Sequence, residues 1–172
     1  MVRNKYLYLK DKMKDFKQII RKTIREFSNE NDLKYNFNIS YEEFDDINNS
    51  VWRNLAHSHR YNDAIIYMKS YLNNNKYNLE DYQIGGILWH IGQLYAFNDD
   101  YENAVKFMSM KNVYDSIEPN YLKGTISYLN GDLEQLQKYY NILVKNDPTG
   151  GSGRDILKNF IDNFDRPYKE IY

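Results

Sequence analysis

The chain has 172 residues, a length that fits one domain with a sizeable hydrophobic core. It contains no cysteine, which excludes disulfides, thiolate metal ligands and a cysteine nucleophile. Its formal net charge of -1 gives no overall attraction to nucleic acid or to membranes, and no apolar run resembles a signal peptide or a membrane span. We therefore expect a cytoplasmic protein that does not enter membranes.

The first predicted element is a basic, amphipathic helix within residues 1–39. Between residues 9 and 27 the apolar positions recur at steps of three and four, which places them in one stripe. The first 25 residues carry nine Lys and Arg against two Asp, and an acidic stretch follows. Two interpretations stay open: the two charged stretches neutralise each other across a helix pair, or the basic face binds an acidic partner or RNA.

A second helix is expected to start after residue 39. In the sequence Ser40-Tyr-Glu-Glu43, the serine hydroxyl and the glutamate carboxylate can each bond a free amide at a helix end. From this capping box we predict a helix that runs towards His57.

The rest of the chain is also predicted to be helical. No later segment shows the strict alternation of a half-buried strand. The prolines all fall where a helix can begin or end: Pro119, Pro148 and Pro167. The chain is therefore predicted to be all-α, with short helices joined as antiparallel pairs.

Three segments in the middle of the chain resemble one another. They are NLAHSHRYNDAIIYMKSYL (54–72), LYAFNDDYENAVKFMSMK (94–111) and SYLNGDLEQLQKYYNIL (127–143). Each ends one helix, turns through polar residues and starts the next helix with a large apolar residue. The aligned positions are Tyr61, Tyr101 and Leu133, then Ala64, Ala104 and Leu136, then Met68, Met108 and Tyr140.

Two glycines extend this repeat. Gly92 and Gly124 lie twelve residues before Ala104 and Leu136, and a helix interior tolerates glycine mainly where another helix passes close. The pattern resembles the tetratricopeptide repeat (TPR) family, whose unit is a helix-turn-helix of about 34 residues with small residues at the helix crossing.

The middle copy carries the resemblance best, and the outer copies are degenerate. The matching residues of the middle copy are Leu88, Ile91, Gly92, Tyr95, Tyr101 and Ala104. The departures are Trp52 in place of a small residue, Ser127 in place of a tyrosine and Leu136 in place of an alanine. The resemblance covers residues 41–145, with irregular spacing between copies.

The resemblance implies a right-handed stack of helix pairs, a TPR-like α-solenoid, over residues 40–145. A glycine-rich hinge (146–154) and a capping helix with its tail (155–172) are expected to follow. The first helix of each pair would line a concave surface. Its inward, protein-binding positions would be Asn49, Arg53, His57, Trp89, Gln93, Phe97, Tyr121, Thr125 and Tyr128. The alternative is that several of these pack against the N-terminal or the last helix.

No catalytic site, metal site or cofactor is predicted. His57 and His59 are two residues apart, a spacing that diverges on a helix, and no HExxH-type spacing exists. The acidic pairs fall at helix starts or turns, where carboxylates cap amides. The stretch TGGSGRD lacks the GxxxxGK[ST] frame of a phosphate loop and follows a helix, so it predicts a hinge before a helix that starts near Asp155. Arg154 could still hold an anion there.

The function predicted from these observations is non-catalytic protein binding. Within that class, a small degenerate repeat protein could be an immunity protein that neutralises an interbacterial toxin by complementary charge. One alternative is a co-chaperone or regulatory adaptor that holds a peptide in the concave groove. A second alternative is a nucleic-acid-binding module that uses the basic N-terminal helix.

Overall fold

A computed structural model describes residues 35–111, 119–146 and 151–172, and these residues are all-α, as predicted. The helices in chain order are α2 (Tyr41–Phe44), α3 (Val51–His57), α4 (Tyr61–Asn75), α5 (Asp81–Phe97), α6 (Tyr101–Lys111), α7 (Pro119–Leu129), α8 (Leu133–Asn146), α9 (Ser152–Asp162) and α10 (Tyr168–Ile171). The basic helix predicted at the N-terminus falls almost entirely on residues 1–34, outside the described residues.

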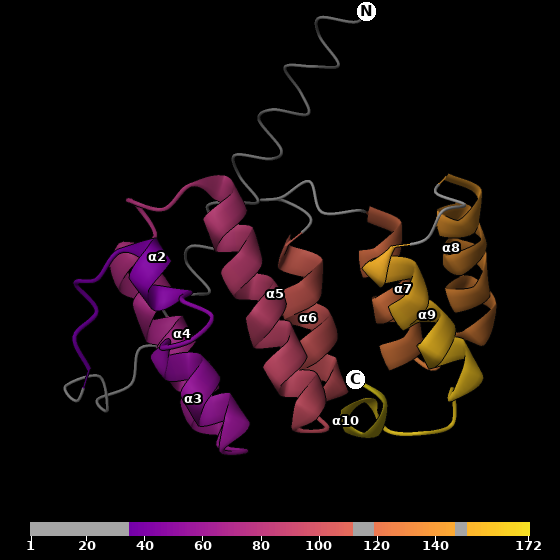
Figure 1. Cartoon of the computed structure of the whole chain (residues 1–172), viewed down its shortest axis with the longest axis horizontal. Helices are drawn as coiled ribbons and strands as arrows, with labels where there is room; N and C mark the ends of the chain where they lie inside the picture. Colours follow the sequence, from indigo (N-terminus) through magenta and orange to yellow (C-terminus); the bar gives the residue numbers. More distant parts are fainter. Residues whose placement is uncertain (1–34, 112–118, 147–150) are drawn as a thin grey trace, which may run out of the picture.

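Helices that are neighbours in the sequence pack on one another. The antiparallel pairs α3–α4, α5–α6 and α7–α8 follow one another along the long axis of the molecule, and α9 packs on both α7 and α8 (Figure 1). Further contacts join α4 to α5 and α6 to α7. This stacking is compatible with a helical repeat.

The turn inside each pair has the same backbone geometry. His59, Asp99 and Gly131 all adopt left-handed conformations, with φ of 56°, 59° and 71°. In each turn this residue's amide bonds the carbonyl three residues back, and the next amide bonds the carbonyl five residues back, as in a Schellman motif. The three aligned sequence segments therefore make one shared structural turn.

The single helix predicted over residues 40–57 is wrong, because it is interrupted. Ser40 does cap α2, since its Oγ accepts a hydrogen bond of 3.1 Å from the amide three residues on. However, Asp46 Oδ1 accepts hydrogen bonds from the amides of Asn48 and Asn49, at 2.7 and 3.1 Å. Such a local side-chain turn competes with the helical ladder, so the chain leaves α2 and re-enters a helix only at α3.

The two glycines of the repeat lie against different helices. A Cβ at Gly92 would lie 2.6 Å from Met108 Cγ and 3.1 Å from the Ala104 carbonyl oxygen, so α5 and α6 approach each other closely there. A Cβ at Gly124 would instead lie 2.9 Å from Leu157 Cδ2. Leu157 belongs to α9, so the third pair uses its glycine to receive the last long helix.

The expected boundary of the last helix also moves. We expected the helix to start near Asp155, but α9 begins at Ser152, inside the glycine-rich stretch. A Cβ at Gly153 would lie 3.2 Å from the Tyr121 ring. Glycine at this position therefore permits close packing of α9 on α7, in addition to any freedom it gives the joint.

The buried side chains form two clusters that share α5 and α6. The first gathers residues of α2 to α6, and the second gathers residues of α5 to α10. Ile84, Ile87, Leu88 and Ile91 of α5 belong to the first cluster, whereas Trp89 and Ala96 of the same helix belong to the second. Because α5 contributes to both, it couples the two halves of the molecule.

Candidate functional site: the cleft between helices α3 and α5

The nine predicted concave residues differ widely in exposure. Thr125 is fully buried, and Trp89, Gln93 and Tyr128 are also buried. Arg53, Phe97 and Tyr121 are half-buried, while Asn49 and His57 are exposed. A partner can therefore reach only part of the predicted row.

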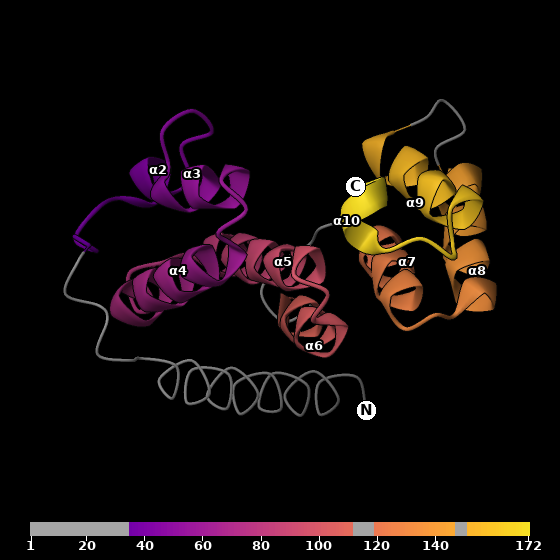
Figure 2. The same ribbon diagram turned by 90° about the horizontal axis from the view of Figure 1, so that it is seen from below.

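Helix α10 fills the middle of this row. Figure 2 shows α10 between the two ends of the molecule, on the side that also carries α3 and α9. Its Tyr168 is fully buried, lies edge-to-face on Phe97 at a centroid distance of 5.2 Å and stacks on Tyr172 at 5.1 Å. The chain's own C-terminal aromatic residues thus occupy the centre of the surface that sequence analysis assigned to a partner.

Hydrogen bonds fix the chain leading into α10. The Tyr168 amide donates to the Tyr101 hydroxyl at 3.0 Å, and the Tyr128 hydroxyl donates to the Arg166 carbonyl. Lys169 pairs with Asp99 across the turn before α6, at 2.5 Å. Tyr128, predicted as a protein-binding residue, instead anchors this segment.

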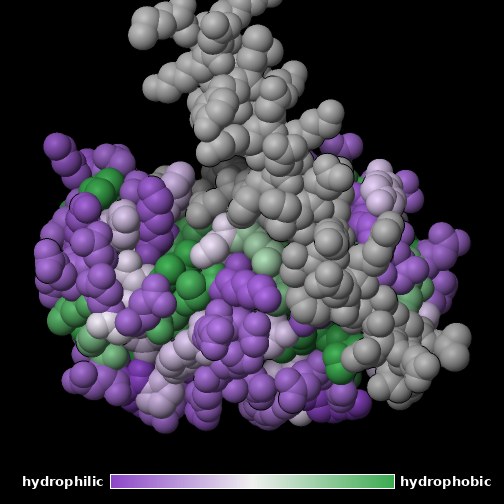
Figure 3. All heavy atoms as spheres, turned by 180° about the vertical axis from the view of Figure 1, so that it is seen from behind, coloured by the Kyte–Doolittle hydropathy of each residue, from purple (hydrophilic) through white to green (hydrophobic). Residues whose placement is uncertain are grey.

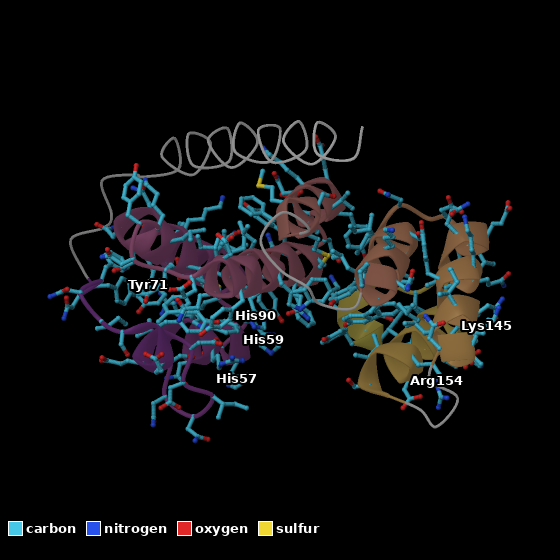
Figure 4. All side chains as sticks on the ribbon, turned by 90° about the horizontal axis from the view of Figure 1, so that it is seen from above. His57, His59, Tyr71, His90, Lys145 and Arg154 are labelled. Atoms are coloured by element: carbon cyan, nitrogen blue, oxygen red, sulfur yellow. The ribbon has the colours of Figure 1, made fainter. Side chains whose placement is uncertain are left out.

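An open cleft remains on one side of α10. We call it the α3–α5 cleft; it encloses about 540 Å³, and Tyr172 forms one wall. Its aromatic and ionisable lining consists of Trp52, Arg53, His57, His59, Tyr61, His90 and Phe97. Figure 4 shows the three histidines gathered between α3 and α5.

Arg53 is held at the wall of the cleft by two contacts. Its Nη2 pairs with Asp45 at 2.8 Å, and its guanidinium lies over the Trp52 ring, 4.1 Å from the centroid. Trp52 in turn packs against His90, with ring centroids 4.8 Å apart. These contacts make a cation–π stack that reaches from α3 to α5.

Two donors in this stack lack an acceptor. Within the part of the chain that the structure describes, Trp52 Nε1 and Arg53 Nε are buried and have no hydrogen-bond partner. Buried N–H groups are nearly always paired in folded proteins, so two unpaired donors on consecutive residues are an unusual feature of this wall.

The floor of the cleft is tied to the C-terminal tyrosine. Gln93 Nε2 donates to the Tyr172 hydroxyl at 2.9 Å, which leaves Gln93 Oε1 as the acceptor facing His90 Nδ1 at 2.9 Å. Gln93, predicted as a binding residue, serves here to orient His90 and Tyr172.

Sequence analysis missed Trp52, His59, Tyr61 and His90 as cleft residues. The argument that His57 and His59 diverge on a helix does not apply, because His59 lies in the left-handed turn after α3, where its Nδ1 lies 2.9 Å from the Tyr61 hydroxyl. Both histidines border the same cleft, which α5 completes with His90. Trp52 had already been noted as a departure from the repeat, and that departure was the available signal.

A second cleft of about 560 Å³ lies on the other side of Tyr172. Its lining includes Trp89, Tyr121 and the start of α9 with Arg154. Burial, with Tyr172 close by, raises the pKa of Tyr121 well above its ordinary range. Arg154 approaches the neighbouring Asp155 carboxylate at only 3.4 Å, and Figure 4 places it far from the histidines.

The acidic pairs singled out in the sequence have local structural contacts. Asp45 pairs with Arg53, and Asp46 accepts two backbone amides. Asp99 forms part of a turn, while Asp100 Oδ1 accepts the Asn103 amide at 3.1 Å at the start of α6. Among the described residues, no three or more His, Cys, Asp or Glu side chains group as metal ligands would.

Comparison of the chain with protein-family models, with curated proteins and with solved structures finds no match. Over the described ranges, no helix combines the length and the apolar character needed to span a membrane. On the side opposite to Figure 1, the described residues that remain visible are mostly hydrophilic, with smaller hydrophobic areas between them (Figure 3).

Proposed function

We propose that this protein is a non-catalytic binding protein that uses the α3–α5 cleft to hold another protein. The observation that carries the proposal is the open aromatic and cationic lining of the cleft beside α10. Arginine and aromatic side chains are the usual anchors of protein interfaces. Here Arg53 and Trp52 are stacked in place, so binding would need little further ordering of them.

We further propose that the helix stack is a short, degenerate TPR-like solenoid. The shared turn geometry at His59, Asp99 and Gly131 supports equivalent helix pairs. The crossing of α5 and α6 at Gly92 supports the TPR type of pair. The large aromatic residue at Trp52 and the packing of Leu157 at Gly124 are the departures from a regular array.

The biological role that we propose within this class is toxin neutralisation by an immunity protein. A preformed cleft on a packed helical body suits a partner that must be held tightly, because little conformational entropy is lost on association. Peptide capture along the whole concave face is less well supported. An extended peptide crossing the middle of that face would have to displace the fully buried Tyr168.

The test is affinity capture with the tagged full chain from its native host, at low and high salt. We expect one stoichiometric protein partner that persists at high salt and is lost with Arg53→Gln. The matched control is Arg60→Gln, since Arg60 also pairs with an aspartate, Asp63, but does not line the cleft. Recovery of nucleic acid alone, or of nothing, contradicts the proposal.

The toxin-neutralising role has its own test. The gene of the captured partner is expressed in a sensitive cell with and without this chain. Growth arrest by the partner alone, relieved by co-expression of the wild-type chain and restored with Arg53→Gln, is the expected result. A partner that does no harm by itself would contradict neutralisation while leaving protein binding intact.

A further inference from the structure

We propose that the α3–α5 cleft binds the carboxylate of an Asp or Glu side chain on a partner surface that is otherwise basic. This inference rests on the proposed function and specifies the chemistry of the contact. The donors would be Arg53, Trp52 and the exposed His57.

The charges of the lining favour an anion. The ionisable side chains that line the cleft, among the described residues, are Arg53, three histidines and two tyrosines, with no Asp or Glu. Asp45 lies behind Arg53 and bonds its Nη2, which offsets part of the charge. A guanidinium has five N–H donors, so this one bond leaves further donors for a ligand.

The unpaired donors indicate what kind of atom is missing. Only 5% of the Trp52 surface is exposed to solvent. Within the described chain, neither Trp52 Nε1 nor Arg53 Nε has a hydrogen-bond acceptor. Both residues line the cleft. A carboxylate offers about four lone-pair sites on two oxygens and can therefore accept several such donors at once.

The surrounding contacts hold these donors in place. The guanidinium of Arg53 stacks on Trp52, Trp52 packs on His90, and Gln93 bonds His90 Nδ1 at 2.9 Å. Tyr172 then fixes Gln93 at 2.9 Å. These contacts hold the Arg53 and Trp52 side chains at the cleft wall, which limits the side-chain entropy lost on binding.

The charge of residues 35–172, which follow the basic N-terminal stretch, favours a protein carboxylate over a nucleic acid at this cleft. Residues 35–172 carry 13 Lys and Arg against 19 Asp and Glu. This excess of negative charge repels a phosphate backbone, whose binding grows with the number of phosphates neutralised. A single carboxylate on a basic protein surface avoids that repulsion and adds complementary charge around the cleft.

The experiment is an NMR titration of the full ¹⁵N-labelled chain with defined probes. The ligand is the peptide Ac-Lys-Gly-Glu-Gly-Lys-NH₂, and its control carries Gln in place of Glu. The reporter is the indole Nε1–H signal of Trp52, assigned with Trp52→Phe and compared with that of Trp89. A (dT)₁₀ oligonucleotide is titrated in parallel.

We expect the Glu peptide to shift the Trp52 signal with a Kd of roughly a millimolar, the range of a single anchored contact. The Gln peptide should bind at least about tenfold more weakly, because it offers no charge-assisted acceptor. Arg53→Gln should weaken the Glu peptide by a similar factor, while Arg60→Gln should leave it unchanged. The exposed residue His57, replaced by Asn, gives a second cleft variant in case Arg53→Gln perturbs folding.

Three results would overturn the inference: no shift of the Trp52 signal by the Glu peptide, equal shifts by both peptides, or a shift by the oligonucleotide alone. The same variants separate this inference from the proposed function. A protein partner that is still captured by Arg53→Gln would exclude the carboxylate contact but not protein binding. Binding of the Glu peptide without capture of any protein would support the carboxylate contact and contradict the proposed protein-binding function.

Discussion

The two halves of the molecule each contain a glycine inside a helix, but the two glycines contact different partner helices. At the crossing of α5 and α6, Gly92 lies against the Ala104 carbonyl and Met108, so the glycine joins two helices of one pair. In the second half, Gly124 of α7 lies against Leu157 of α9. A small residue in a helix therefore marks a close approach, but it does not say which helix makes that approach.

This difference follows from how each core is completed. The first core is built from helices that follow one another along the chain, from α2 to α6. The second core also takes side chains from α9 and α10, which return over α7 and place Phe160 and Tyr168 at its centre. The C-terminal half is thus closed by the end of the described chain, and this closure covers the middle of the concave row.

The largest expected effect comes from truncating the second core. Phe160 is fully buried and stacks on Tyr128 at a centroid distance of 4.5 Å. Phe160→Ala should therefore lower the free energy of unfolding by about 3–5 kcal/mol. Because α5 contributes to both cores, urea denaturation should show a single transition. The fluorescence of Trp52 and that of Trp89 should report the same transition, each measured in a variant in which the other tryptophan is replaced by Phe.

The matched variant in the first core is Phe44→Ala, since Phe44 is also buried and stacks on Tyr71 at 3.8 Å. We expect a loss of similar size, about 3–5 kcal/mol. If each substitution moved only the tryptophan signal of its own core, the two halves would be independent and α5 would not couple them.

The next effect separates the two glycines. Gly92→Ala should cost about 1–3 kcal/mol, because the new methyl meets the fixed Ala104 carbonyl as well as Met108. Gly124→Ala should cost less, because Leu157 presents only the end of a side chain and alanine adds up to about 1 kcal/mol of helix propensity.

A double-mutant cycle sharpens that contrast. In a Leu157→Ala background, Gly124→Ala should become stabilising by up to about 1 kcal/mol, because the clash is gone and the helix propensity remains. The measurement is the urea midpoint of all four proteins. An equal cost of Gly124→Ala in both backgrounds would show that α9 does not pack at this glycine.

A smaller effect is expected where α10 is tied to α6, the second helix of the middle pair. Tyr101→Phe removes the hydroxyl that accepts the Tyr168 amide, and this should cost about 1 kcal/mol. Hydrogen exchange of the Tyr168 amide should become faster while exchange in α4 stays unchanged. Tyr82→Phe is the control, because Tyr82 is exposed; no difference between the two variants would contradict the bond.

The smallest expected effect depends on pH and belongs to the first half. Burial, with Lys106 nearby, lowers the pKa of Lys69 to about 8 from its ordinary 10.5. Between these values the unfolded chain binds more protons than the folded chain, so the stability contributed by this group rises with pH. Urea midpoints from pH 7 to 10 should therefore rise relative to Lys69→Met, and parallel curves would contradict this.

Above about pH 10, both halves of the molecule should lose stability as the pH rises. Burial raises the pKa of Tyr71 and of Tyr128 to about 12. The unfolded chain releases these protons first, near pH 10, so stability falls as pH rises from about 10 to 12. Tyr71→Phe and Tyr128→Phe should each reduce the steepness of that fall.

Local sequence signals determined the helices and their turns. The all-α character, the cap at Ser40 and the three aligned turns follow from periodicity and from side chains that bond nearby backbone groups. The break after α2 was missed although the capping box at Ser40 was recognised. The turn that breaks the helix depends on the Asp46 side chain, and an aspartate at that position is also compatible with a continuous helix.

Only the tertiary structure decided which surfaces stay open. Sequence analysis placed Gln93 and Tyr128 on a concave row, but the return of α9 and α10 covers the middle of that row. Both residues instead form hydrogen bonds to the C-terminal segment. The same return leaves the α3–α5 cleft open beside Tyr172. The packing of α5 beside α3 brings His90 close to the histidines at the end of α3. Residues far apart in the chain meet there because burying the aromatic side chains of α10 lowers the free energy, and periodicity along one helix contains no information about such a partner.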